Sequence, residues 1–214
     1  MHVYVIANGN CDVSLLKELK KNRDDKYIIC ADGGAALAVQ AGLIPDLLIG
    51  DFDSLSPIFL TRIAESGSQI KKFPVEKDET DTELAIKEAL TLKIHTLTLL
   101  GGWGSRWDHS LSNINLLAGA LKKRPHLEVK MMDQKNELWV ANKYLEINGQ
   151  KGDPLSLLPY SHIVSGVTTS GLYYPLTNAR LYRESTLALS NYFLDNKASI
   201  SIDEGILLVM RSRD

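Results

Sequence analysis

The spacing of apolar residues changes near residue 133, and this change constrains the fold of the chain more than any other feature. From residue 1 to about 133, short apolar runs alternate with longer amphipathic stretches, which indicates βα units and a mainly parallel sheet. Beyond that point, short alternating runs are separated by turn residues, which is typical of a β-sandwich. We therefore expect an α/β domain over 1–133 and an all-β sandwich over 134–214.

The apolar runs also predict the individual elements, and in the first half they give a Rossmann-like order. The expected strands of that half are 2–7, 27–31, 46–49, 69–73, 96–100 and 127–132. The expected helices between them are 13–21, 35–41, 57–66, 80–92 and 110–123. In the second half we expect strands near 136–141, 143–147, 155–158, 162–168 and 186–193, followed by a hairpin of 199–202 and 206–210.

The composition limits the partners of the chain. Its 24 basic and 26 acidic residues leave a formal net charge of −2, which gives no general electrostatic reason to bind nucleic acid or an anionic membrane. No apolar run reaches the length of a bilayer span, and the start of the chain lacks the pattern of a signal peptide. Cys11 and Cys30 form no metal-ligand pattern, so we expect reduced thiols and a cytoplasmic protein.

Two acidic clusters stand at the ends of expected strands, at Gly50–Ser54 (GDFDS) and at Lys77–Asp81 (KDETD). Carboxylates in such numbers suit Mg²⁺, which takes oxygen ligands and is usually shared with the phosphates of a substrate. Ligands of open α/β sheets bind beyond the carboxyl ends of the strands, where these clusters are expected. The clusters therefore indicate phosphoryl chemistry. The alternative for Gly50–Ser54 is a solvated turn.

The second cluster also opens a helix. Thr80, with Glu83 three residues later, predicts a capping box, and the helix that follows has one apolar face. An acidic residue such as Asp81 in the first turn stabilises the helix dipole by about 0.3–1 kcal/mol, which is an alternative to a metal role. Lys77 is suited to contact phosphate, although a solvated lysine explains it equally well.

Two glycine-containing segments follow expected strands and precede helices, at Asp32–Ala35 (DGGA) and at Gly101–His109 (GGWGSRWDH). Glycine allows close approach of the backbone to a ligand, and a helix start offers free N–H groups to an anion. Neither segment fits a P-loop or a dinucleotide fingerprint. Arg106 adds a planar guanidinium that can bind two phosphate oxygens. The alternatives are tight turns without a ligand, and Asp108 acting as a helix cap paired with Arg106 on the surface.

Taken in this order, the four motifs resemble those of the thiamine pyrophosphokinase family in its bacterial form, and the resemblance spans nearly the whole chain. It implies an α/β nucleotide-binding domain followed by a thiamine-binding β-sandwich. It also implies that ATP and thiamine react to give AMP and thiamine diphosphate, by transfer of a pyrophosphoryl group with Mg²⁺. The resemblance further implies a homodimer with thiamine bound between subunits.

The same resemblance assigns roles to individual residues. The implied metal ligands are Asp51, Asp53 and Asp81, which with Asp78 and Arg106 form the implied catalytic set. The implied ATP-binding residues are Asp32, Gly33, Lys77, Thr80, Gly101, Gly102, Gly104, Arg106, Asp108, His109 and Asn113. The implied thiamine-binding residues are Ser190 and Asn191, and Tyr174 or its neighbour Tyr173 is the candidate for an aromatic contact.

The residues leave some alternatives open. Asp81 and Asp78 are both candidates for the group that accepts the hydroxyl proton of thiamine. An Asp-x-Asp motif after a strand also occurs in Mg²⁺-dependent phosphohydrolases, in which one aspartate is phosphorylated. A third reading is a nucleotide-sensing module without catalytic activity.

Overall fold

The computed structural model describes residues 1–53 and 55–213, which form two compact units. Met1–Ala120 and Met131–Gln134 form the first unit, and Leu121–Lys130 with the chain from Lys135 onward form the second. Ser54, the last residue of the first acidic cluster, lies outside the described residues. Within the described part of the chain, no helix is long and apolar enough to cross a membrane.

The first unit contains a parallel sheet with strand order β4-β3-β2-β1-β5. Its strands are β1 (His2–Ile6), β2 (Lys26–Ala31), β3 (Leu47–Gly50), β4 (Gln69–Lys72) and β5 (Thr96–Leu100). The helices that follow them are α1 (Val13–Lys21), α2 (Gly34–Gln40), α3 (Pro57–Glu65), α4 (Asp81–Ala89) and α5 (Trp107–Lys123). The next strand, β6 (Glu128–Met132), has residues in both units.

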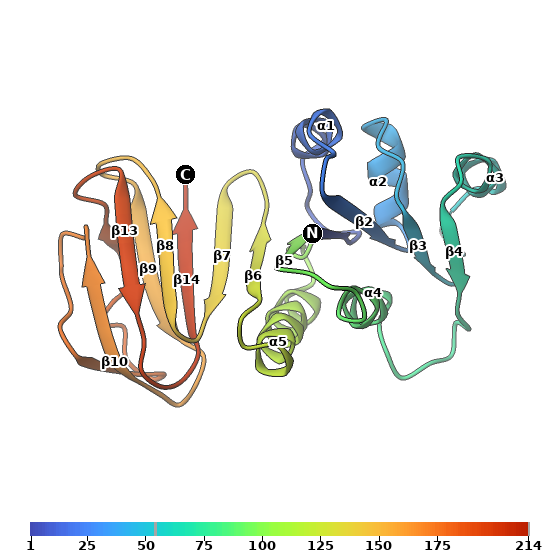
Figure 1. Ribbon diagram of the computed structural model, residues 1–214. Helices are drawn as coiled ribbons and strands as arrows, with labels where there is room; N and C mark the ends of the chain where they lie inside the picture. Colours follow the sequence, from blue (N-terminus) through green and yellow to red (C-terminus); the bar gives the residue numbers. More distant parts are fainter. Residues whose placement is uncertain (54, 214) are drawn as a thin grey trace. The chain divides into compact units, whose positions relative to one another are not determined.

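The helices of the first unit cover its sheet and form an apolar core with it. Alternate residues of β2 point to opposite faces, so Ile28 and Cys30 pack in one cluster with Leu16 of α1 and Ala38 of α2. Figure 1 shows α1 and α2 on one face of the sheet and α4 on the other. With both faces covered, the carboxyl ends of the strands remain the free edge at which loops can form a site.

The predicted boundaries of the first half agree closely with those observed. The largest differences are three residues: α5 begins at Trp107 instead of the predicted Ser110, and α4 ends at Ala89 instead of the predicted Leu92. α4 begins at Asp81 because Thr80 acts as its cap and accepts the Glu83 N–H at 3.2 Å. The Thr80 cap predicted from the sequence is therefore confirmed.

The second unit consists of antiparallel strands in two layers. One layer has the order β7-β14-β9-β12 and the other β11-β10-β13-β8. Their bounds are β7 Asn136–Ala141, β8 Tyr144–Asn148, β9 Pro154–Pro159, β10 Ile163–Ser170, β11 Ala179–Tyr182, β12 Asn191–Tyr192, β13 Lys197–Ser201 and β14 Leu207–Ser212.

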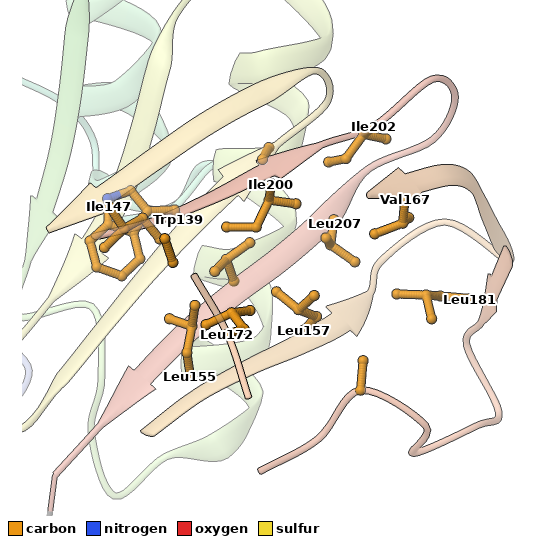
Figure 2. Packing of buried hydrophobic residues seen from close by; sticks show 14 of the residues in the cluster. Trp139, Ile147, Leu155, Leu157, Val167, Leu172, Leu181, Ile200, Ile202 and Leu207 are labelled. Carbon is orange, nitrogen blue, oxygen red and sulfur yellow. The ribbon is translucent and has the colours of Figure 1, made fainter. Parts of the chain in front are cut away.

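One apolar cluster joins the two layers of this unit. Figure 2 shows Leu157 and Leu207 from one layer near Ile200 and Val167 from the other, and all four belong to the same buried cluster. Phe193, which is fully buried, belongs to this cluster as well. The fold class expected from the sequence is confirmed, since a mainly parallel α/β unit precedes an antiparallel β unit.

Two expectations for the second half are wrong, and one strand was missed. Segments 199–202 and 206–210 do not form a hairpin, because β13 pairs with β8 and β10 whereas β14 pairs with β7 and β9. The chain therefore passes from one layer to the other at Asp203–Gly205. Turn residues are expected there both in a hairpin and in a connection between layers, so the sequence did not distinguish the two. Within the predicted strand 186–193, only Asn191–Tyr192 is extended in a sheet. The short strand β11 was not predicted.

Candidate active site

A cavity of about 510 Å³ lies in the first unit, at the carboxyl ends of β1, β2, β3 and β5 and beside the start of α4. Most of the sequence motifs meet there, as expected for an open α/β sheet. The predicted site residues that line it are Asp32, Asp51, Lys77, Thr80, Asp81, Gly101, Gly102, Gly104, Arg106, His109 and Asn113.

Lys77 joins the two acidic clusters. Its Nζ lies 3.1 Å from Asp81 Oδ1 and 3.8 Å from Asp51 Oδ2, and only 12% of its side chain is exposed. Burial raises the pKa of Asp81, while Lys77 lowers it in part and the carboxylates of Asp51 and Asp32 raise it further. The cavity therefore holds several carboxylates close together, with one ammonium group between two of them.

Two of the predicted carboxylates lie elsewhere. Asp53 and Asp78 are exposed and do not line the cavity. Asp53 lies in the turn after β3, where its backbone N–H donates to Asp51 Oδ1 at 3.1 Å. Across residues 1–53 and 55–213, no group of three or more His, Cys, Asp or Glu side chains is arranged to hold a metal ion. The structure thus does not bring Asp51, Asp53 and Asp81 together as one ligand set.

The turn after β2 places Asp32 at the cavity. Asp32 has a positive φ of 41°, a conformation that aspartate tolerates better than most residues, and its carbonyl accepts the Ala35 N–H at 3.0 Å. Gly33 does not line the cavity, but a Cβ there would lie 2.5 Å from the Asn8 side chain. The glycine therefore allows α2 to begin directly against the loop that follows β1.

The glycine-rich loop after β5 is held by side chains of α5. Asn113 is 8% exposed, and its Nδ2 donates to the Gly102 carbonyl at 2.8 Å. Ser110 Oγ accepts the Gly104 N–H at 3.2 Å. Gly101 has a φ of 67°, and a Cβ there would lie 2.2 Å from the Ala7 carbonyl oxygen. Ser110 and Asn113 both line the cavity and also fix the loop.

Arg106 and Asp108 pair with each other, as one alternative reading proposed. Arg106 Nη2 lies 2.6 Å from Asp108 Oδ2, and the two side chains are 70% and 64% exposed. Arg106 holds the pKa of Asp108 below its ordinary value. Asp108 lies in the first turn of α5 and does not line the cavity, whereas Arg106 and His109 do. Arg106 is therefore at the mouth of the cavity and bound to a partner that a stronger anion can replace.

Sequence reasoning missed the loop after β1. Asn8 and Gly9 line the cavity, and the Asn10 N–H donates to the Trp103 carbonyl at 2.6 Å. A signal was present, because Asn8–Asn10 (NGN) are turn residues directly after the first strand. This loop supports the glycine-rich loop from the neighbouring strand.

The second unit carries an aromatic cluster at its surface. The rings of Tyr173 and Tyr192 stack with centroids 4.5 Å apart, and Tyr174 meets Tyr173 edge-on at 4.8 Å. Tyr174 is 60% exposed. Leu172, the residue before Tyr173, is buried in the apolar core of this unit. It therefore offers a firmly held aromatic surface.

Asn191 is a buried part of this cluster. Its Oδ1 accepts the N–H groups of Tyr174 and Tyr192 at 3.0 and 2.9 Å, and its Nδ2 donates to the Tyr174 carbonyl at 2.8 Å. Ser190 is exposed, with a positive φ of 57°, and its N–H donates to Ser156 Oγ. The amide of Asn191 thus fixes the backbone of Tyr174, while the hydroxyl of Ser190 faces a more open environment.

Comparisons with known proteins agree with this arrangement. The family model described as "Thiamin pyrophosphokinase, catalytic domain" matches residues 18–130, and the model described as "Thiamin pyrophosphokinase, vitamin B1 binding domain" matches residues 143–207. A thiamine pyrophosphokinase of Bacillus subtilis is 29% identical, with 99% of each chain covered. One from Arabidopsis thaliana is 26% identical over 85% of this chain and 76% of the relative.

Solved structures give the same result. The thiamine pyrophosphokinase structure from Bacillus subtilis superposes with a TM-score of 0.87 at 28% identity, over 100% of both chains. The structure from Geobacillus thermodenitrificans gives a TM-score of 0.83 at 29% identity, over 100% of this chain and 98% of that one. The catalytic-domain model alone covers more than half of the chain. The chain therefore belongs to the thiamin pyrophosphokinase family.

Proposed function

We propose that this protein transfers a pyrophosphoryl group from ATP to the hydroxyl of thiamine and releases AMP and thiamine diphosphate. The observation that carries the proposal is the cavity of the first unit, where Lys77 lies between Asp51 and Asp81 at the carboxyl ends of the strands. Transfer of a pyrophosphoryl group needs in-line positioning and neutralisation of negative charge more than covalent chemistry. Lys77 and Arg106 supply positive charge at that cavity.

The carboxylates of the cavity fit Mg²⁺ shared with a substrate. Asp51 and Asp81 would hold it, with Asp32 nearby, because Mg²⁺ is usually bound by one or two carboxylates together with phosphates and water. When bound, Mg²⁺ neutralises charge on the triphosphate. Asp53 remains a candidate ligand from the family resemblance, although its exposed position outside the cavity gives it less support.

Asp81 is the better supported candidate for the proton acceptor. It lines the cavity, where a bound substrate can reach its carboxylate. Asp78 is exposed and outside the cavity. We therefore assign the hydroxyl proton of thiamine to Asp81 and a supporting role to Asp78.

The aromatic cluster of the second unit would bind thiamine. Thiamine carries a positively charged aromatic ring, which the faces of tyrosine rings attract. Tyr174 and Tyr173 are exposed and suited to this contact, and Ser190 offers a hydroxyl beside them. Asn191 would act through Tyr174, because its amide is bonded to the backbone of that residue.

A homodimer with thiamine between subunits completes the proposal. It follows from the family resemblance, and the exposed apolar side chains of Leu187, Leu189 and Leu194, on either side of Tyr192 in the sequence, support a covered surface. Light scattering after size exclusion would test it, with a mass of about twice 23.7 kDa expected. A monomeric mass at micromolar concentration would contradict the dimer.

The central experiment is a product analysis. The protein is incubated with ATP, Mg²⁺ and thiamine, and AMP and thiamine diphosphate are expected in equal amounts. Phosphate release without thiamine, or a trapped phospho-aspartate, would instead identify a phosphohydrolase. Nucleotide binding without turnover would identify a sensing module. Omission of thiamine is the matched control, because the transferase should then form almost no AMP.

A further inference from the structure

Lys77 shares its partners with the proposed metal ion. Its Nζ lies 3.1 Å from Asp81 Oδ1 and 3.8 Å from Asp51 Oδ2, and it donates to the Pro74 carbonyl at 3.0 Å. Only 12% of the side chain is exposed, and lysines are rarely buried to this extent without a partner. Asp51 and Asp81 are also the carboxylates that would hold Mg²⁺. Two different cations therefore have the same two carboxylates as ligands.

The burial of these groups sets the two cations in competition. Asp81 Oδ1 is buried, and Lys77 Nζ lies beside it. Like charges a few ångströms apart repel strongly where little water screens them. The ammonium is therefore disfavoured in its present position once a divalent cation shares these carboxylates. Lys77 has to leave one or both of them when the metal binds.

Another kind of partner is available to Lys77. It lines the same cavity as Arg106 and the glycine-rich loop, where phosphate is expected. A lysine carries its charge on a flexible stem, whereas Asp51 directly follows β3 and Asp81 lies in the first turn of α4. The ammonium can therefore move by side-chain rotation while the two carboxylates stay in place. A phosphate group of the nucleotide would then be its new partner.

We propose that Lys77 is an exchangeable counter-ion of the metal site. It neutralises Asp51 and Asp81 in the free protein, leaves them when Mg²⁺ binds, and then contacts phosphate of the nucleotide. This inference rests on the proposed function for the metal role of the two carboxylates. Its consequence is that the metal binds weakly alone and more tightly when a phosphate receives the ammonium. Lys77 thus couples the binding of metal and nucleotide.

The first test compares Lys77→Met with Lys87→Met in the full chain, without nucleotide. Methionine keeps an unbranched apolar side chain and removes the charge. Lys87 is a matched control, because its Nζ also pairs with two carboxylates, Glu79 at 3.0 Å and Glu83 at 2.8 Å, which are not proposed metal ligands. A gain in metal affinity that is specific to Lys77→Met therefore reports the exchange and not a general change of charge.

Mn²⁺ is the probe, since it takes the same oxygen ligands as Mg²⁺ and its free concentration is measured by electron paramagnetic resonance. We expect Lys77→Met to bind Mn²⁺ about tenfold more tightly than wild type, and Lys87→Met to stay within about twofold of wild type. Adding Asp81→Asn to Lys77→Met should remove this gain, because the metal then loses a ligand. Mn²⁺ should also raise the unfolding temperature of Lys77→Met more than that of wild type.

The wild-type protein provides a measurement that does not depend on the folding of a variant. Lysine acetylation followed by mass spectrometry reports how accessible each amine is. Labelling of Lys77 should be slow without metal, because its Nζ is paired and its side chain is 12% exposed. Saturating Mg²⁺ should raise its rate about twofold or more, while labelling of Lys87 stays unchanged. A non-hydrolysable ATP analogue added with Mg²⁺ should lower the rate again.

The outcomes separate the exchange from the proposed function. Equal Mn²⁺ affinity in wild type and a folded Lys77→Met, or an equal gain in Lys87→Met, would overturn the exchange. Unchanged labelling of Lys77 in wild type at saturating Mg²⁺ would overturn it as well. Binding of Mn²⁺ to neither protein would remove the metal role of Asp51 and Asp81, and the exchange with it. If exchange is observed but no AMP and thiamine diphosphate are formed, the proposed function alone fails, because metal binding requires no turnover.

Discussion

In the first unit, Asp51 and Asp81 approach Lys77 at the wall of a cavity, whereas in the second unit Asn191 is buried and bonded to the backbone of two tyrosines. The first arrangement keeps charged groups beside open space. In the second arrangement, the polar side chain of Asn191 bonds to backbone groups. The aromatic rings are then the groups that remain exposed to a ligand.

The sheet topologies account for this difference. In a parallel sheet every strand ends at the same edge, so the residues that follow β1, β2, β3 and β5 collect around one cavity. In antiparallel layers successive strands end at opposite edges, so polar residues seldom gather and more often satisfy nearby backbone groups. Neighbouring polar residues therefore tend to have different roles in the two units.

The largest expected effect is that of Asp81→Asn, which removes a charge from the cavity of the first unit. We expect turnover to fall about 10²- to 10³-fold, as for the loss of one strong electrostatic group of an active site. Stability should not fall, because a raised pKa means that folding disfavours the ionised carboxylate of Asp81 at neutral pH. Steady-state kinetics and thermal unfolding measure the two quantities.

Glu83→Gln is the control for that variant. Glu83 lies two residues later on α4 and pairs with Lys87 at 2.8 Å, outside the cavity. Its turnover should stay near that of wild type. Near-normal turnover of Asp81→Asn would remove the basis for assigning this cavity as the reaction centre.

An intermediate effect is expected for Asn191→Ala in the second unit. Loss of the amide leaves backbone groups of Tyr174 and Tyr192 without their partner, which should lower the free energy of unfolding by about 1–3 kcal/mol. If Asn191 positions Tyr174, the KM for thiamine should rise while the KM for ATP stays unchanged. Urea unfolding and separate substrate titrations test both expectations.

Asn196→Ala and Asn191→Asp sharpen this result. Asn196 is exposed, so its replacement should change stability by at most about 0.5 kcal/mol. Aspartate at position 191 keeps an acceptor for the two N–H groups but places a buried oxygen against the Tyr174 carbonyl in place of the donor, so no rescue of stability is expected. Full stability in Asn191→Ala would show that these hydrogen bonds contribute little.

The smallest effect concerns alkaline pH, and it should arise in the first unit, which contains both cysteines. Burial, with the charges of Asp12 and Asp133, raises the pKa of Cys11 to about 11. In the unfolded chain a cysteine ionises near pH 8.5, so the unfolded state releases a proton that the folded state keeps. This contribution to stability is complete below about pH 8.5 and is lost as pH rises toward 11.

Cys11→Ala should therefore lose less stability than wild type between pH 8 and pH 10. The measurement is the change in urea midpoint of each protein between the two pH values. Lysines and tyrosines titrate in both proteins, so their effect cancels when the change for Cys11→Ala is subtracted from that for wild type. Cys30 is fully buried and its pKa is raised as well, so Cys30→Ala tests the same linkage at a second position. Identical pH dependence in Cys11→Ala and wild type would exclude the contribution of Cys11.

Local pattern was enough to predict most of the first unit. Apolar runs at 2–7 and 27–31 and the Thr80 cap depend on neighbours within a few residues, so they can be recognised along the chain. The position of the motifs at the ends of parallel strands follows from the same pattern. In the second unit the turn Asp203–Gly205 was recognisable, but the pairing of β13 and β14 depends on partners that are distant in sequence.

The sequence alone determined the order of elements, the two kinds of sheet and the motifs that identify the family, because these depend on short-range periodicity and residue type. Only the tertiary structure decided that Lys77 lies between Asp51 and Asp81 and that Asp53 does not line the cavity. It also decided that Asn191 is bonded to the backbone of Tyr174. Such relations depend on how loops from different strands meet, and no local pattern encodes the distance between two side chains that are far apart in the chain.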